Sequence, residues 1–161
     1  MTKYAYLDTP IGRLLLAGSG EALTVIAFPS GSRARDPGDD WQYAADAFDR
    51  PRRQLDEYFA GKRRTFELTL APRATPFQKR VLDALLGIQY GATRSYSDIA
   101  RQIGAPRAVR AVGAANGANP LPIVIPCHRL LGADGSLTGF GGGLERKRWL
   151  LNLEQGGYLD V

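Results

Sequence analysis

The chain has 161 residues, of which 44% are hydrophobic, and a formal net charge of +5, so it can bury one core comfortably or two small ones. No stretch approaches the ~18 uncharged apolar residues of a membrane span, and the N-terminus, with an acid at Asp8 and no long apolar run, is unlike a signal peptide. A single cysteine cannot form an internal disulfide, and a reactive thiol survives best where it is kept reduced, so we expect a cytoplasmic protein.

The beginning of the chain predicts a small antiparallel sheet. Short β-prone runs are separated by turn sequences that contain Gly and Pro, and these runs are residues 3–8, 13–17 and 23–28. Residues 29–41 are rich in Gly, Pro, Ser, Asp and Arg and predict an exposed loop.

A helix and a further strand are predicted after that loop. Residues 51–60 predict a helix with proline in its first turn, Tyr58 on its apolar side and Gly61 as its terminator. In residues 65–70 hydrophobic residues alternate with polar ones, which predicts a strand.

The second half of the chain predicts helices. One begins at Pro76 and is closed by Gly87. Ser95 with Asp98 three residues later is a variant of the capping box, which predicts a short helix that ends at Gly104.

A further helix is predicted to begin at Pro106, with Arg107 and Arg110 on its outer face at i, i+3. Two short helices joined by Gly-Ala-Pro predict a helix-turn-helix. Many such pairs bind no DNA, so this element alone does not decide the function.

The positive charge is concentrated in the second half. Residues 1–72 contain ten Lys and Arg against ten Asp and Glu, whereas residues 73–161 contain eleven against six. Between Tyr90 and Ala133 only one acid, Asp98, accompanies the basic residues Arg94, Arg101, Arg107, Arg110 and Arg129. Such an excess is common on solvated surfaces, but its concentration favours a polyanion such as DNA as a partner.

The only cysteine and the only histidine, Cys127 and His128, are neighbours. A lone cysteine is often just a small buried hydrophobe, and a lone histidine is often structural. A thiol with a pKa of about 8.5 is only a few per cent ionised at neutral pH, so an adjacent base would assist a reaction of the thiolate. The pair therefore indicates nucleophilic catalysis. No Cys/His set could build a zinc site, and residues 139–143 lack the Gly-Lys ending of a phosphate loop, so we expect no metal and no cofactor.

Five ordered blocks within residues 75–156 carry a resemblance to a known family. They are Pro76-Phe77-Gln78, Gly91-Ala-Thr-Arg-Ser-Tyr96, the run from Arg110 to Pro120 that continues into Pro126-Cys127-His128-Arg129, Gly139-Phe140-Gly141-Gly142-Gly143, and Trp149-Leu150-Leu151-Asn-Leu-Glu154. In these blocks the chain resembles the O6-alkylguanine-DNA alkyltransferases, which are suicide DNA-repair proteins.

The resemblance implies both a fold and a function. The expected fold is an α/β N-terminal domain of ribonuclease-H-like type, a small antiparallel sheet plus helix, over residues 1–72. A mainly helical C-terminal domain containing the helix-turn-helix follows over residues 73–161. The implied activity is irreversible, single-turnover transfer of an alkyl group from O6-alkylguanine, and from O4-alkylthymine, in duplex DNA to Cys127.

The resemblance also implies the catalytic roles. Cys127 is the nucleophile, His128 is the base that acts through a bound water, and Glu154 is the acid that orients the imidazole. Without the resemblance, Glu154 would be taken for a surface charge on a helix. Tyr96 helps to protonate the departing base, and Asn119 braces the turn before the active-site strand.

DNA contacts and a substrate pocket are implied in the same way. Arg110 enters the duplex and fills the gap left by the flipped nucleotide, which must leave the stack for its alkyl group to reach a buried sulfur. The other expected DNA contacts are Arg107, Ala111, Gly113, Arg94 and Tyr96, and the expected pocket residues are Pro122, Leu130, Phe140 and Gly141. Phe140 stands where many relatives have tyrosine, and Gly141 where some have serine. We expect activity to persist, because a backbone amide can still reach the guanine oxygen.

Three rival functions differ in their use of the thiol. Alkyltransferase-like proteins that bind lesions without repairing them replace the cysteine, usually by tryptophan, so Cys127 argues against that function. A cysteine hydrolase would turn over repeatedly, and a DNA-binding regulator would need neither thiol nor imidazole. We expect a monomer that can cluster on double-stranded DNA, with no membrane and no metal among its partners.

Overall fold

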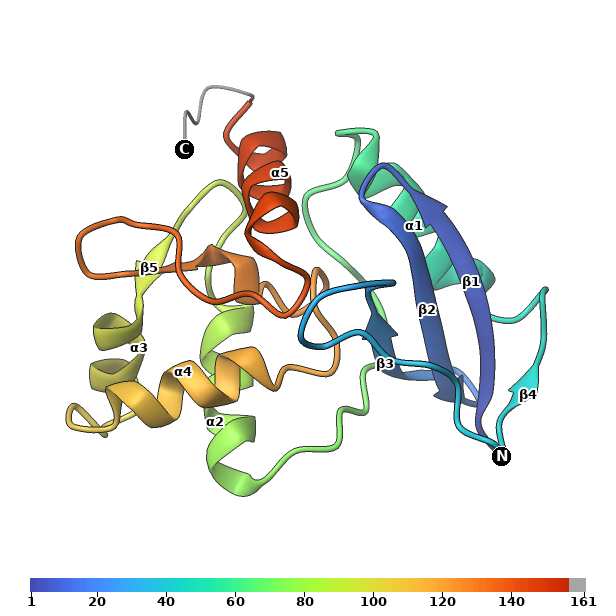
Figure 1. The fold of residues 1–161 in the computed structure, drawn as a ribbon, viewed down its shortest axis with the longest axis horizontal. Helices are drawn as coiled ribbons and strands as arrows, with labels where there is room; N and C mark the ends of the chain where they lie inside the picture. The colour runs from blue at the N-terminus through green and yellow to red at the C-terminus, as the bar shows by residue number, and fades with distance from the viewer. Residues whose placement is uncertain (157–161) are drawn as a thin grey trace.

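The computed structural model describes residues 1–156, so the last five residues of the predicted second domain lie outside the described part. Figure 1 shows a sheet with a helix on one side of the molecule and a group of helices on the other. None of the helices in the described range is long and apolar enough to cross a membrane.

The predicted meander forms the sheet. Its strands β1 (Lys3–Thr9), β2 (Gly12–Ser19) and β3 (Ala22–Ala27) pair antiparallel in sequence order. A two-residue strand that was not predicted, β4 (Gln42–Tyr43), pairs parallel with β1, so the order is β3-β2-β1-β4. The sheet is therefore mixed at one edge rather than purely antiparallel.

Helix α1 (Asp49–Phe59) packs on the sheet, as Figure 1 shows. Its side chains Leu55 and Tyr58 are fully buried. Gly61, the predicted terminator, follows the helix with a φ of 74°, a left-handed conformation that glycine adopts at little cost.

The predicted strand at residues 65–70 is wrong. Only Leu70 makes an isolated bridge, with Leu23. The reason lies in Gln54 of α1, whose side chain accepts the N–H of Glu67 at 2.9 Å and donates to the Glu67 carbonyl at 3.2 Å. Both backbone groups of Glu67 are therefore satisfied by a side chain, and the segment pairs with the sheet only at Leu23, through Thr69 and Ala71.

Helix α2 (Pro76–Leu86) begins at Pro76 as predicted, directly after its cap Thr75, and α3 (Tyr96–Gln102) begins directly after the predicted cap Ser95. In both, the capping side chain and the third helical residue satisfy each other's backbone N–H groups. Helix α4 (Val109–Gly117), which packs on α2 and α3, begins later than predicted. The N–H of Ala108 bonds back to Ala105, so Arg107 lies in a turn before the helix instead of sharing a helical face with Arg110.

The remaining elements surround the cysteine. A 3-10 turn, η1 (Cys127–Arg129), takes the place of the expected active-site strand because the N–H of Arg129 turns back to the Pro126 carbonyl. The short strands β5 (Arg94–Ser95) and β6 (Leu130–Leu131) pair parallel, and α5 (Leu144–Glu154) packs against η1.

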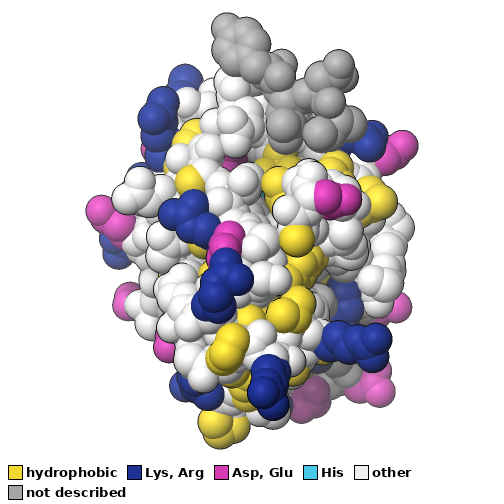
Figure 2. All heavy atoms as spheres, turned by 90° about the vertical axis from the view of Figure 1, so that its left-hand side faces the viewer, with side chains coloured by type: hydrophobic (Ala, Val, Ile, Leu, Met, Phe, Trp, Pro, Cys, Tyr) yellow, Lys and Arg dark blue, Asp and Glu magenta, His cyan; other side chains and the backbone are white. Residues whose placement is uncertain are grey.

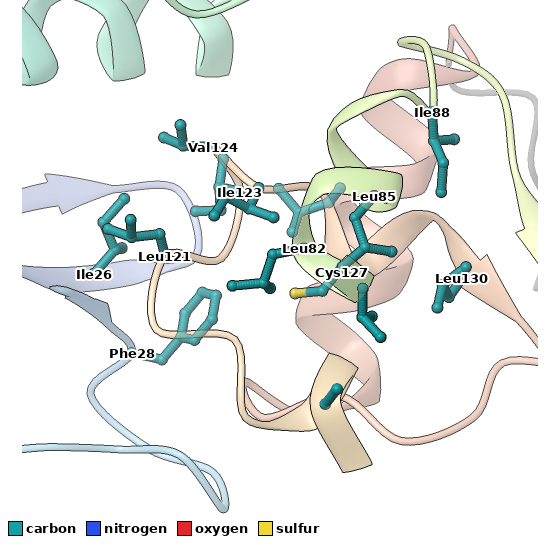
Figure 3. Packing of buried hydrophobic residues seen from close by; sticks show 14 of the residues in the cluster. Ile26, Phe28, Leu82, Leu85, Ile88, Leu121, Ile123, Val124, Cys127 and Leu130 are labelled. Atoms are coloured by element: carbon teal, nitrogen blue, oxygen red, sulfur yellow. The ribbon is translucent and has the colours of Figure 1, made fainter. Parts of the chain in front are cut away.

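One continuous hydrophobic cluster joins the sheet and the helices. Figure 3 shows Ile26 and Phe28 from the sheet side together with Leu82, Leu121 and Cys127 from the helical side. The cysteine therefore lies where the two halves of the chain meet.

Candidate active site

A braced turn presents the cysteine. Asn119 donates from Nδ2 to the Ile125 carbonyl at 2.8 Å and accepts the N–H of Leu121 at 3.0 Å. Within this turn Ile123 has a φ of 76°, a conformation that costs a side-chain-bearing residue on the order of 1–3 kcal/mol. Asn119 thus bonds to both sides of this turn, and its role in the reaction stays a prediction.

The thiol of Cys127 is buried, with 3% of the residue exposed. Burial raises its pKa to about 11, although a hydrogen bond with Asn119 and the positive charge of Lys147 act in the opposite direction. A thiol in this environment is protonated at neutral pH, so its reaction as a nucleophile requires a base.

His128 is completely buried and lies next to Glu154, with 2.7 Å between Nε2 and Oε2. Burial lowers the pKa of the imidazole, and the hydrogen bond with Glu154 opposes that shift only in part. A neutral imidazole that donates from Nε2 to the carboxylate leaves a lone pair on Nδ1. Nδ1 is buried and has no hydrogen-bond partner within residues 1–156, so it is available to accept a proton.

Glu154 is the centre of a buried polar network. Its Oε1 accepts from Arg129 Nε at 2.7 Å, and its Oε2 accepts from Arg129 Nη2 at 2.9 Å and from the Tyr58 hydroxyl at 2.6 Å. Burial would raise the pKa of the carboxyl, but His128 and Arg129 outweigh it and hold that pKa well below its usual range. The carboxylate is therefore ionised and fixed, as an orienting group must be.

Two residues of this network, Arg129 and Tyr58, were not predicted to belong to the site. Arg129 is not one of the DNA-facing arginines, because it is buried, pairs with Glu154 and donates from Nη1 to the Ile88 carbonyl at 2.6 Å. Its position inside the apolar run of residues 123–131 was the available signal.

Lys147 is a second buried cation that the sequence analysis missed. Its Nζ donates to the carbonyls of Leu130 at 2.5 Å and Thr138 at 2.8 Å. Burial lowers its pKa to about 8, and the thiol of Cys127 opposes that shift. The charge of Lys147 therefore favours the thiolate form of Cys127.

A cavity of about 510 Å³ reaches Cys127. Among the expected pocket residues, Pro122, Phe140 and Gly141 line it, together with Phe28 from the end of β3. Leu130 does not, because it is fully buried in the core. The rings of Phe28 and Phe140 lie 5.5 Å apart, so the sheet side of the molecule forms part of the cavity wall.

The expected DNA contacts lie on and beside α3 and α4. Most of them are exposed: Arg94, Arg107, Arg110 and Ala111. Tyr96 is half-buried at the start of α3, where its hydroxyl accepts a hydrogen bond from Thr138 at 3.0 Å, and Gly113 of α4 lies against its ring. Figure 2 shows this side of the molecule, with Lys and Arg side chains spread across it among hydrophobic ones.

No three His, Cys, Asp or Glu side chains gather as possible metal ligands within residues 1–156.

Known proteins share both the sequence and the fold. The model of the 6-O-methylguanine DNA methyltransferase ribonuclease-like domain matches residues 2–72, and that of the DNA binding domain of the same protein matches residues 76–156. The methylated-DNA–protein-cysteine methyltransferase of Methanosarcina acetivorans is 48% identical over 151 residues, which are 94% of this chain and 97% of that protein. The protein of that name from Mycobacterium tuberculosis is 51% identical over 162 residues, with 96% and 93% covered.

The solved structures agree. The crystal structure of Mycobacterium tuberculosis OGT in complex with DNA is 50% identical, covers 96% of this chain and 94% of its own, and superposes with a TM-score of 0.91. The structure of the O6-methylguanine methyltransferase of the same organism gives the same TM-score of 0.91 at 49% identity. The predicted arrangement of an N-terminal sheet-and-helix domain and a helical C-terminal domain is confirmed, and the chain belongs to the 6-O-methylguanine DNA methyltransferase family.

Proposed function

We propose that this protein repairs DNA by moving an alkyl group from O6-alkylguanine onto its own Cys127, irreversibly and once per molecule. The observation that carries the proposal is the buried pair of Cys127 and His128, in which Nε2 of the imidazole is engaged by Glu154 and Nδ1 is left as an acceptor. The names of the relatives, methylated-DNA–protein-cysteine methyltransferases, support it.

The chemistry is a displacement at carbon. The sulfur of Cys127 bonds to the alkyl carbon while the bond from that carbon to the guanine oxygen breaks. The thiol proton passes through a bound water to Nδ1 of His128, and the departing guanine takes up a proton with help from the hydroxyl of Tyr96. Positioned proton transfer of this kind contributes roughly 10²–10⁴-fold to a rate. The product is a thioether, from which the sulfur is not regenerated.

DNA binding is assigned to the helix-turn-helix made by α3 and α4. The alkylated oxygen lies at the base edge inside the duplex, so the nucleotide must be flipped out to reach Cys127. Arg110 fills the vacated gap, while Arg107, Arg94, Ala111, Gly113 and Tyr96 contact the DNA around it. The exposure of Arg94, Arg107, Arg110 and Ala111 supports this assignment.

The remaining features of the proposal concern the substrate and the setting. Pro122, Phe140 and Gly141 border the alkyl group, and O4-alkylthymine is a second substrate. The domain boundary lies between residues 72 and 73, and the N-terminal domain is of ribonuclease-H-like type. The protein works in the cytoplasm as a monomer that can cluster on DNA.

Intact-mass analysis after incubation with an oligonucleotide that contains O6-methylguanine tests the proposal. One methyl group should be gained per protein molecule, on Cys127, with no second turnover. Cys127→Ala should gain none and still bind DNA. Repeated release of product would refute the suicide mechanism, and DNA binding by the wild type without any mass gain would indicate a lesion-binding protein instead.

A further inference from the structure

The N-terminal domain reaches into the proton relay through Tyr58. This residue of α1 is completely buried, and its hydroxyl donates to Oε2 of Glu154 at 2.6 Å. The same oxygen lies 2.7 Å from Nε2 of His128. One carboxylate oxygen thus serves the proposed base and a phenol from the other domain.

The phenol of Tyr58 keeps its proton at neutral pH and is therefore a donor. Burial and the neighbouring Glu154 raise the pKa of Tyr58 far above its ordinary value. The ring is held by aromatic neighbours, with centroids 5.4 Å from Phe59, 5.5 Å from Phe66 and 6.2 Å from Tyr90. The hydroxyl therefore has a fixed direction as well as a fixed proton.

The carboxylate does not depend on Tyr58 for its orientation. Arg129 grips both carboxylate oxygens, and its Nη1 is fixed by the carbonyl of Ile88. Removal of the phenolic oxygen alone would leave this grip in place. What Tyr58 changes is the charge that Oε2 presents to His128, because a hydrogen bond from a second donor draws electron density from the same oxygen.

We propose that Tyr58 is a positioning residue of the relay, acting through Glu154 to keep His128 able to accept the thiol proton. This proposal rests on the function proposed above. If Oε2 had fewer donors, it would hold the imidazolium more strongly, and His128 would already carry a proton before the thiol needs to lose one. A phenol weakens that hold without adding a charge.

The other charged and titratable groups around the pair are known. Arg129 of η1 and Lys147 of α5 both disfavour the imidazolium by like charge. Cys127 is adjacent to His128 in η1. The guanidinium groups of Arg129 and Arg64 lie over the Tyr90 ring, 5.8 and 5.3 Å from its centroid. Tyr58 is a neutral donor to the shared oxygen that comes from the other domain.

The chain has a single histidine, so the imidazole signals in an NMR titration of the full-length protein belong to His128. In Tyr58→Phe, the pKa of His128 should rise relative to the wild type. The acidic limb of the pH profile for alkyl transfer, where His128 becomes protonated, should move to higher pH. At a pH on this limb, Tyr58→Phe should react about three- to tenfold more slowly than the wild type, and at higher pH its rate should not be lowered. A merely structural role would lower stability without moving the limb.

Tyr90→Phe is the matched control. It removes a hydroxyl from the same aromatic cluster, but within residues 1–156 that hydroxyl bonds only to the Leu153 carbonyl, at 3.4 Å. Neither the pKa of His128 nor the acidic limb should move in this variant.

Site-specific 3-fluorotyrosine at position 58 is a second test that keeps the hydroxyl and the packing. Its more acidic phenol is a stronger donor, so the pKa of His128 should fall. An unchanged or lowered pKa of His128 in Tyr58→Phe, or an unchanged one with fluorotyrosine, would overturn the proposal. The NMR measurement needs no alkyl transfer, so failure of the proposed repair activity would appear separately, as a wild-type protein that gains no alkyl group.

Discussion

Arg129 is expected to contribute more to stability than any exposed arginine of this chain. Only 8% of its side chain and 1% of that of Glu154 are exposed. Arg129→Ala removes donors at 2.7 and 2.9 Å from the carboxylate and a third at 2.6 Å from the Ile88 carbonyl. Because water cannot replace these donors, loss of one member of such a buried pair costs about 3–5 kcal/mol.

Urea unfolding at pH 7 measures this cost directly. In thermal unfolding, a loss of 3–5 kcal/mol should lower the Tm of a protein of this size by roughly 6–20 °C. Arg101→Ala is the matched control, because Arg101 pairs with Asp98 while their side chains are 62% and 41% exposed. Exposed pairs contribute about 0–1 kcal/mol, and the control should stay within that range.

The stabilisation by the Arg129–Glu154 pair should depend on pH. Folding lowers the pKa of Glu154, so the stabilisation is complete above the unfolded-state pKa of about 4.3 and is lost as the pH falls towards the folded-state pKa. The difference in unfolding free energy between wild type and Arg129→Ala should therefore narrow below about pH 4. A loss at pH 7 no larger than that of Arg101→Ala would refute the buried-pair reasoning.

Two further predictions concern the thiol and the DNA. Lys147→Met keeps an unbranched side chain but removes the cation, so the pKa of Cys127 should rise above its value of about 11. The reaction of Cys127 with iodoacetamide at pH 7 should then slow by about tenfold. An unchanged rate would contradict this prediction, and Arg148→Met, at an exposed neighbouring position, is the control. Arg110→Ala should strongly slow repair of duplex DNA but not the reaction with free O6-benzylguanine, which needs no flipping, whereas Arg107→Ala should only reduce the salt dependence of binding by about one phosphate. Equal slowing of both reactions in Arg110→Ala would show that Arg110 serves the pocket or the fold.

Local chemistry explains which elements could be predicted from the sequence. The capping residues Thr75 and Ser95 act within one turn of their helices, so the pattern contains the whole interaction. The predicted strand at residues 65–70 is wrong because the backbone N–H and carbonyl of Glu67 bond to the side chain of Gln54, 13 residues away. The alternation of hydrophobic and polar residues indicates which side of a segment is buried. It does not show which groups the backbone of that segment bonds to.

The site divides in the same way. Cys127 and His128 were found because they are adjacent, and Glu154 was found through the family resemblance. The apolar neighbourhood of Arg129 indicated that it is buried, but its role was misassigned because its partner, Glu154, is 25 residues away. In the sequence Tyr58 was expected only to pack on the apolar side of its helix. Nothing in the sequence of α1 indicates the carboxylate of Glu154, to which its hydroxyl donates.

The buried face of α5 supplies a charged residue next to Cys127 and another next to His128, and the spacing of this face could have been recognised in the sequence. Lys147, Leu150, Leu151 and Glu154 are its buried residues, at the spacing i, i+3, i+4, i+7 of one helical face. Two charges on such a face are costly unless each has a partner, and here the cation faces the thiol while the carboxylate faces the imidazole. The cation favours the thiolate and the carboxylate favours the protonated imidazole, so both charges of one helix favour the proton transfer that we propose, from the sulfur of Cys127 to His128.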